Sequence, residues 1–75
     1  MKIEIDDKNG YNIIPGGGQT VAIEKTFKGK AKAHIIISPR VVDDVDAVVA
    51  EATATKQGFH QVVQRLGLPV YWGES

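Results

Sequence analysis

The sequence contains no cysteine. This absence excludes disulfide bonds, thiolate zinc sites and a cysteine nucleophile. Net charge is also absent, because nine basic side chains balance nine acidic ones. A nucleic-acid binder held by overall positive charge is therefore excluded, although a local basic patch is not.

Long apolar runs are missing too. None approaches the ~20 residues that a helix needs to cross a bilayer. The N-terminal segment MKIEIDD is too acidic and alternates too regularly for a signal peptide. We therefore expect a cytoplasmic protein without a membrane partner.

The remaining composition is that of an ordinary globular domain, with 43% hydrophobic and 24% charged residues. A chain of 75 residues allows a single domain, residues 1–75, in which all elements share one small core. Residues 25–40 hold five basic side chains and no acidic one, whereas the segments on both sides are acidic overall. This asymmetry is typical either of a binding face or of a fold whose ends attract its middle.

A first hairpin is predicted near the N-terminus. The Asn9-Gly10 pair favours a type I′ turn, because both central residues of that turn take positive φ. The turn would pair residues 2–7 with residues 11–14 and set Ile5 opposite Ile14.

A second hairpin is predicted from residues 19–27 and 31–38. Both segments alternate apolar and polar residues, and a loop centred on Gly29 keeps the apolar positions of the two strands on one face. Residues 15–18, a proline and three glycines, are interpreted as a loose connector at which pairing stops. The expected pairs of the second hairpin are Val21 with Ile37, Ile23 with Ile35, Phe27 with Ala31, Glu24 with His34 and Thr26 with Lys32.

Two helices are predicted in the second half of the chain. The longer helix runs from Pro39 to Gln57 with Ser38 as its N-cap, because proline is tolerated at the first helical position. The shorter helix runs from Phe59 to Leu66 and ends at a glycine. Residues 70–72 follow as an edge strand or as an apolar lid. The core-facing arc of the longer helix consists of Val41, Val42, Val45, Val48, Val49 and Ala52.

These elements predict an α+β fold. It is a small single domain with a mainly antiparallel sheet of about four strands, arranged as two hairpins and packed on one long and one short C-terminal helix.

The side chains that carry most enzyme chemistry do not form a set. His34 on a strand and His60 on a helix have no ligand-like spacing. Ser38 is explained as a helix cap and Ser75 is the terminal residue, which leaves a Ser-His-Asp triad without a nucleophile. We therefore expect no metal, no cofactor and no enzymatic activity.

The basic segment provides one candidate binding surface. Lysines on a hairpin tip can follow a phosphate backbone, but they also protect a hairpin from edge-to-edge aggregation. The aromatic interleaving typical of single-strand binders is missing, because Phe27 is assigned to the inner face. The residues of this alternative nucleic-acid site are Lys25, Lys28, Lys30, Lys32 and Arg40.

A second candidate surface joins the outer face of the longer helix to the C-terminal aromatic residues. Alanines let a partner approach closely, and Tyr and Trp are over-represented among interface hot spots. Alanine is also the best helix former, so a passive surface is the competing interpretation. The candidate protein-binding residues are Asp43, Asp44, Ala47, Ala50, Glu51, Ala54, Tyr71 and Trp72.

The sequence thus predicts a non-enzymatic protein-binding module. Its expected partner is another protein, nucleic-acid binding is the alternative, and a small homo-oligomer is compatible with the sequence. In size and character the short, cysteine-free, motif-poor chain resembles the small phage and mobile-element proteins that block host machinery by binding, such as anti-CRISPR proteins. This resemblance involves no specific residue and implies no site.

Overall fold

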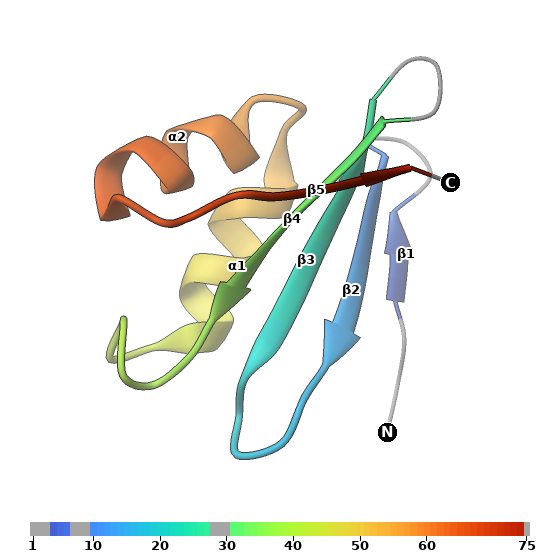
Figure 1. Cartoon of the computed structure of the whole chain (residues 1–75). Coiled ribbons are helices and arrows are strands. Elements are labelled where there is room, and N and C mark those ends of the chain that lie inside the picture. The colour runs from blue at the N-terminus through green and yellow to red at the C-terminus, as the bar shows by residue number, and fades with distance from the viewer. Residues whose placement is uncertain (1–3, 7–9, 28–30, 75) are drawn as a thin grey trace.

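The computed structural model describes residues 4–6, 10–27 and 31–74. The strands form one antiparallel sheet in sequence order, β1-β2-β3-β4-β5 (Figure 1). Both helices lie on the same face of this sheet. The elements are β1 (Glu4–Asp6), β2 (Tyr11–Pro15), β3 (Val21–Thr26), β4 (Ala31–Ile37), α1 (Val45–Ala54), α2 (Gly58–Leu66) and β5 (Tyr71–Glu74).

The predicted α+β fold is confirmed, and the sheet is larger than the expected two hairpins. β2 pairs with β3, which merges both hairpins into one meander. The C-terminal residues 71–74 add an edge strand next to β4, so the lid interpretation of this segment is wrong.

The register predicted for β3 and β4 is confirmed. Val21 lies opposite Ile37 and Ile23 opposite Ile35. The N–H of Phe27 donates to the carbonyl of Ala31 at 2.9 Å. Apolar alternation determined this register, because a slip of one residue would move every apolar side chain to the wrong face.

The register predicted for β1 and β2 is wrong by two residues. Ile5 lies opposite Asn12 rather than Ile14. The carbonyl of Gly10 accepts the N–H of Thr26 at 2.9 Å, so Gly10 already runs alongside β3. Gly10 does take positive φ, 77°, while the preceding turn residues lie outside the described part of the chain.

The segment interpreted as a loose connector is a defined turn between β2 and β3. The N–H of Gly16 donates to the carbonyl of Thr20 at 2.6 Å, and the N–H of Thr20 donates to the carbonyl of Gly17 at 3.1 Å. Gly18 and Gln19 both take positive φ, 61° and 67°. β2 and β3 therefore stay paired as far as Pro15, which lies opposite Val21. The prediction that pairing stops at Pro15 is wrong.

Helix α1 is shorter than predicted at both ends. Ser38 does not cap it: its carbonyl accepts the N–H groups of Val41 and Val42 in a turn outside the helix. The N-cap is Asp44, whose Oδ1 accepts the N–H of Ala47 at 3.1 Å. A carboxylate acceptor this close to the apolar arc is a strong N-cap signal, and the serine-proline interpretation overlooked it.

Gly58 lies at the start of α2 and not directly after the longer helix. The sequence suggested this glycine as the residue after the longer helix, but α1 ends at Ala54 and Gly58 is the first residue of α2. The shorter helix ends as predicted, with Gly67 in the left-handed region at φ 65° and its N–H bonded to the carbonyl of Val63.

The core lies between the sheet and the helices, and Tyr11 connects the two layers. Its side chain is 1% exposed and its ring stacks against Phe59 with centroids 6.2 Å apart. The Tyr11 hydroxyl donates to the carbonyl of Thr55 at 3.0 Å and accepts the N–H of Phe59 at 3.1 Å. The hydroxyl of Tyr11 therefore links the connection between α1 and α2 to β2 through hydrogen bonds.

Tyr11→Phe is expected to lower the free energy of unfolding by about 1–2 kcal/mol. The substitution keeps the ring but leaves a buried N–H and a carbonyl without their hydroxyl partner. Urea denaturation followed by circular dichroism measures this loss. Tyr71→Phe, at a half-exposed phenol, is the control and should change stability little; equal losses would contradict the role of the Tyr11 hydroxyl.

Candidate functional site

β5 is the edge strand at the C-terminal side of the sheet. The chain reverses after α2, where the N–H of Leu68 also bonds to the carbonyl of Val63, and then runs antiparallel to β4. In the described residues no strand pairs with the other side of β5. An edge of this kind exposes a row of backbone donors and acceptors that can pair with another chain.

The hydrogen-bond phase of the sheet determines which β5 groups point outward. The N–H of Phe27 donates to the carbonyl of Ala31, so the odd-numbered residues of β4 bond toward β3. Because this direction alternates along a strand, the even-numbered residues of β4 bond toward β5, where their partners are odd-numbered. The backbone groups of Trp72 and Glu74 therefore point away from the sheet.

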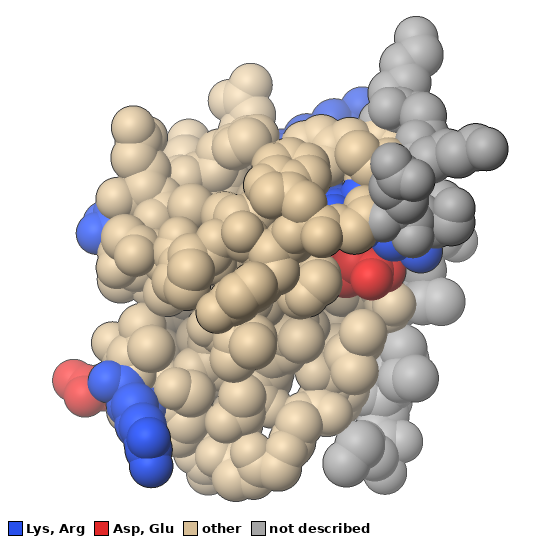
Figure 2. All heavy atoms as spheres, viewed as in Figure 1, with Lys and Arg blue, Asp and Glu red and all other residues tan. Residues whose placement is uncertain are grey.

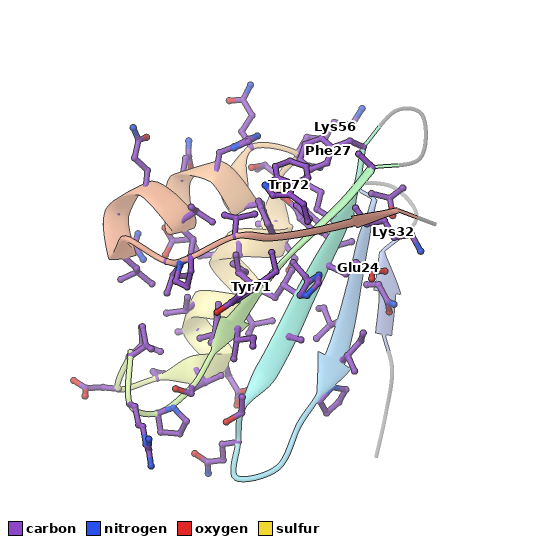
Figure 3. The ribbon with its side chains drawn as sticks, in the orientation of Figure 1. Glu24, Phe27, Lys32, Lys56, Tyr71 and Trp72 are labelled. Carbon is purple, nitrogen blue, oxygen red and sulfur yellow. The ribbon has the colours of Figure 1, made fainter. Side chains whose placement is uncertain are left out.

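Trp72 is the most exposed large apolar side chain among the described residues, with 64% of its surface accessible. It projects to the helix side of the sheet (Figure 3). Its ring lies 5.5 Å from that of Phe27, centroid to centroid, and Phe27 in turn lies 6.1 Å from His60 on α2. The tryptophan is thus supported on one side and open on the other.

Tyr71 projects to the opposite face of β5, which the helices leave uncovered (Figure 3). Its ring stacks on that of His34 across the strand pair, with centroids 5.7 Å apart, and 47% of its surface is accessible. The two aromatic residues of the edge strand therefore flank it from both faces.

The surface around β5 carries little charge. Figure 2 shows the side of the molecule on which β5 lies, and uncharged residues cover most of it, with Lys, Arg, Asp and Glu near its margins. Charged side chains and prolines are the usual protection of an edge strand against pairing. β5 contains no proline and no lysine, and its one charged residue is Glu74 at its C-terminal end.

The predicted strip on α1 is exposed as expected, but two of its three carboxylates are engaged within the protein. Asp44 caps the helix. Glu51 forms a two-bond salt bridge with Arg65 of α2, in which Nη2 donates to Oε1 at 2.9 Å and Nη1 donates to Oε2. The hydrogen bonds and the positive charge of Arg65 hold the pKa of Glu51 below its usual value. The exposed residues of the strip are Asp43, Asp44, Ala47, Ala50, Glu51 and Ala54.

The basic residues of the alternative nucleic-acid site, the hairpin lysines and Arg40 near the helix start, are not gathered on one surface in the part of the chain that the structure describes. Arg40 follows the far end of β4, beyond Ile37, while Lys32 lies near the start of that strand. Lys32 is 3.7 Å from a carboxylate oxygen of Glu24. Lys28 and Lys30 lie outside the described residues.

Lys25 is not on the surface but at the edge of the core. Only 7% of it is exposed, and its Nζ lies 4.6 Å from the ring centroid of Tyr11 and 5.4 Å from that of Phe27. Burial, and to a lesser degree the charge of Lys56, lower the pKa of Lys25. Strand alternation places residue 25 on the same face as Ile23 and thus predicts that it is buried. The charge of Lys25 favoured the opposite interpretation, a surface position.

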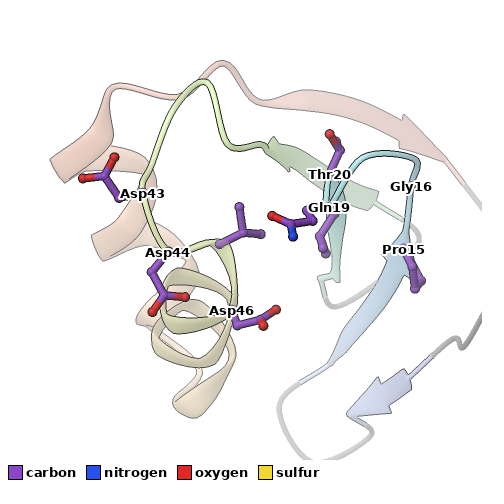
Figure 4. A pocket seen from close by; sticks show the side chains of 9 residues that line it. Pro15, Gly16, Gln19, Thr20, Asp43, Asp44 and Asp46 are labelled. Carbon is purple, nitrogen blue, oxygen red and sulfur yellow. The ribbon is translucent and has the colours of Figure 1, made fainter.

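A cleft of about 230 Å³ lies between the β2–β3 turn and the start of α1 (Figure 4). Three carboxylates line it, from Asp43, Asp44 and Asp46. Negative charge at this place stabilises α1, because the first turn of a helix carries the positive end of its dipole. The structure thus explains these aspartates without a ligand.

The two histidines lie on different elements, His34 on β4 beside Tyr71 and His60 on α2 beside Phe27. In the described ranges, no three His, Asp or Glu side chains come together in an arrangement that could hold a metal ion. The structure also has no helix, within the same ranges, of sufficient length and hydrophobicity to cross a membrane.

No protein-family model matches the sequence, and neither a curated protein nor a solved structure matches the chain significantly. The candidate site is therefore defined by the geometry of β5 alone. Sequence reasoning identified its two aromatic residues but not the outward-pointing backbone of the strand, which becomes visible only when the sheet order is known.

Proposed function

We propose that the chain is a non-enzymatic protein-binding module that accepts an extended segment of its partner along the outer side of β5. The observation that carries this proposal is the combination of an edge strand without an outer neighbour in the described residues and two exposed aromatic side chains on it.

The mechanism is strand addition. Backbone groups of Trp72 and Glu74 bond to the incoming segment and supply affinity for any extended chain, while Trp72 and Tyr71 contact its alternate side chains and supply selectivity. Both rings already lie against neighbouring rings, Trp72 beside Phe27 and Tyr71 stacked on His34. Such support reduces the conformational entropy that the rings lose on binding.

The other surfaces support this function less well. The carboxylates of Asp44 and Glu51 on α1 already have partners within the chain. Nucleic-acid binding stays the alternative prediction, with less support, because Lys25 is buried and Arg40 follows the opposite end of β4 from Lys32.

Inhibition of a host machine, expected from the phage-like character of the sequence, is a narrower form of the same proposal. A module that occupies the strand-pairing edge of an enzyme or assembly factor blocks whatever else that edge binds. The identity of the partner decides this point.

Glu74→Pro is expected to abolish strand addition and to preserve the fold. Proline removes the N–H that points outward at position 74, while the β4–β5 bonds are made by residues 71 and 73. The measurement is binding of linear peptides selected from a displayed random library, with dissociation constants determined for the unmodified chain and the variant. We expect a loss of about tenfold or more.

Ala50→Arg is the matched control on the exposed face of α1. It should leave peptide binding unchanged, and circular dichroism should show both variants folded. Strand addition is contradicted if Ala50→Arg abolishes binding and Glu74→Pro does not. Binding of mixed-sequence DNA with a steep salt dependence would instead support the basic-residue alternative.

A further inference from the structure

We infer that the segment accepted by β5 is the β5 strand of a second copy of this chain, so that two sheets join into one continuous antiparallel sheet. This inference rests on the proposed function and names the partner of that same site. Its basis is that β5 is complementary to itself when it is turned by a two-fold axis.

The hydrogen-bond phase allows few registers for this pairing. In an antiparallel pair, outward-pointing residues must face outward-pointing residues. A two-fold axis at Trp72 satisfies this rule for every residue from 70 to 74, because it sets Trp72 opposite its own copy and Glu74 opposite Val70 of the second copy. Axes at Tyr71 or Gly73 also satisfy the phase, but the axis at Tyr71 overlaps less of the two β5 strands, and the axis at Gly73 does not set Tyr71 opposite Gly73.

The same register places a large side chain next to a residue without one on the uncovered face. Each Tyr71 lies opposite Gly73 of the second copy, and Gly73 has no other atom within 4 Å of the position where a Cβ would be. The tyrosine ring can therefore lie across the glycine, an arrangement that compensates for the weak strand propensity of glycine in designed sheets. Lys32 is the β4 neighbour of Gly73, so the ring extends toward this cation of the second copy.

On the helix side the register brings the two copies of Trp72 together. Cross-strand aromatic pairs are among the most favourable in antiparallel sheets. The tryptophan is 64% exposed in the single chain, and the second copy covers the side that Phe27 leaves open. Since the described surface around β5 carries little charge, its described residues place no cluster of like charges against an identical surface (Figure 2).

The first test is the mass of the unmodified chain by sedimentation equilibrium over a wide concentration range. We expect a reversible shift from 8.1 kDa toward twice that mass. Glu74→Pro should weaken the association about tenfold or more, because each copy loses one outward N–H and the dimer therefore loses two backbone bonds. Ala50→Arg, on α1, should leave the association unchanged.

The second test determines the register and uses the absence of native cysteine. A mixture of Tyr71→Cys and Gly73→Cys chains should form a disulfide-linked heterodimer under mild oxidation, because these positions face each other. Each variant alone should cross-link poorly. The Tyr71→Cys chain lacks one aromatic residue, whereas the Gly73→Cys chain keeps both. Comparing the folding and sedimentation of the two variants therefore shows the effect of losing the tyrosine.

A chain that stays at the mass of one copy up to millimolar concentration overturns the inference. So does an association that Glu74→Pro does not weaken, or efficient cross-linking of Gly73→Cys with itself, which requires another register. In each of these cases the peptide-binding experiment decides separately whether β5 accepts a different partner. Failure of self-association and failure of strand addition are thus distinguished.

Discussion

Ile35→Ala is expected to lower the free energy of unfolding by about 2–5 kcal/mol, because it leaves a cavity in the centre of the core. Ile35 lies on β4, is 0% exposed and faces Ile23 across the strand pair. A domain of this length has a total stability of only about 4–11 kcal/mol. The loss is therefore large enough to unfold a substantial fraction of the variant under mild denaturing conditions.

Ile36→Ala is the matched control, one residue further along the same strand. Ile36 points to the uncovered face and is 46% exposed, so its truncation should cost less than about 1 kcal/mol. Urea denaturation followed by circular dichroism measures both variants. Equal losses at the two positions would show that the helix-covered face has been assigned incorrectly.

Gly58→Ala is expected to cost more than about 2 kcal/mol, by overpacking rather than by a cavity. A Cβ at position 58 would lie 2.5 Å from the carbonyl oxygen of Glu51 and 2.7 Å from that of Ala52. Both atoms belong to the backbone of α1, so they cannot give way as a flexible side chain does. The substitution must push α2 away from α1.

Gly17→Ala is the control for this prediction, since it makes the same chemical change in the β2–β3 turn. No atom lies within 4 Å of the Cβ position there, and the φ of Gly17 is not positive. The substitution should be neutral or stabilise the protein by up to about 1 kcal/mol, because alanine restricts the unfolded chain. Thermal and urea denaturation compare the two; similar losses would refute the close approach of the helices at Gly58.

The elements with a strong local pattern could be predicted from the sequence. The β3–β4 register follows from apolar alternation, because one face is buried and a slip exposes every apolar residue at once. Helix α2 follows from its apolar spacing and from Gly67, whose left-handed conformation ends it. Tyr71 and Trp72 were also identified as candidate contact residues from residue type alone.

Competing local signals were decided by contacts distant in sequence. Ser38-Pro39 and Asp44 are both good helix starts, and the helix begins after Asp44 where Val45 reaches the core. The Asn9-Gly10 pair predicted one β1–β2 register, and the structure has another, in which Ile5 lies opposite Asn12 and Gly10 also bonds to Thr26 of β3.

Two local signals also compete at a single side chain, Lys25. Its position in the alternation requires it to face inward, whereas its charge favours the surface. The rings of Tyr11 and Phe27 resolve this conflict, because their faces attract the ammonium group while its aliphatic stem is buried. The sequence alone does not show that these two rings together surround the ammonium group of Lys25.

The sequence by itself determined the α+β class, the pairing of β3 with β4, the short second helix and the aromatic character of the C-terminal segment, since each depends on residues close together in the chain or on one repeating period. The tertiary structure decided the sheet order, the burial of Lys25, the role of the Tyr11 hydroxyl and the open outer side of β5. These features arise where segments far apart in the chain meet. The proposed function depends on the last of them, because a strand becomes an edge only through the positions of all the other strands.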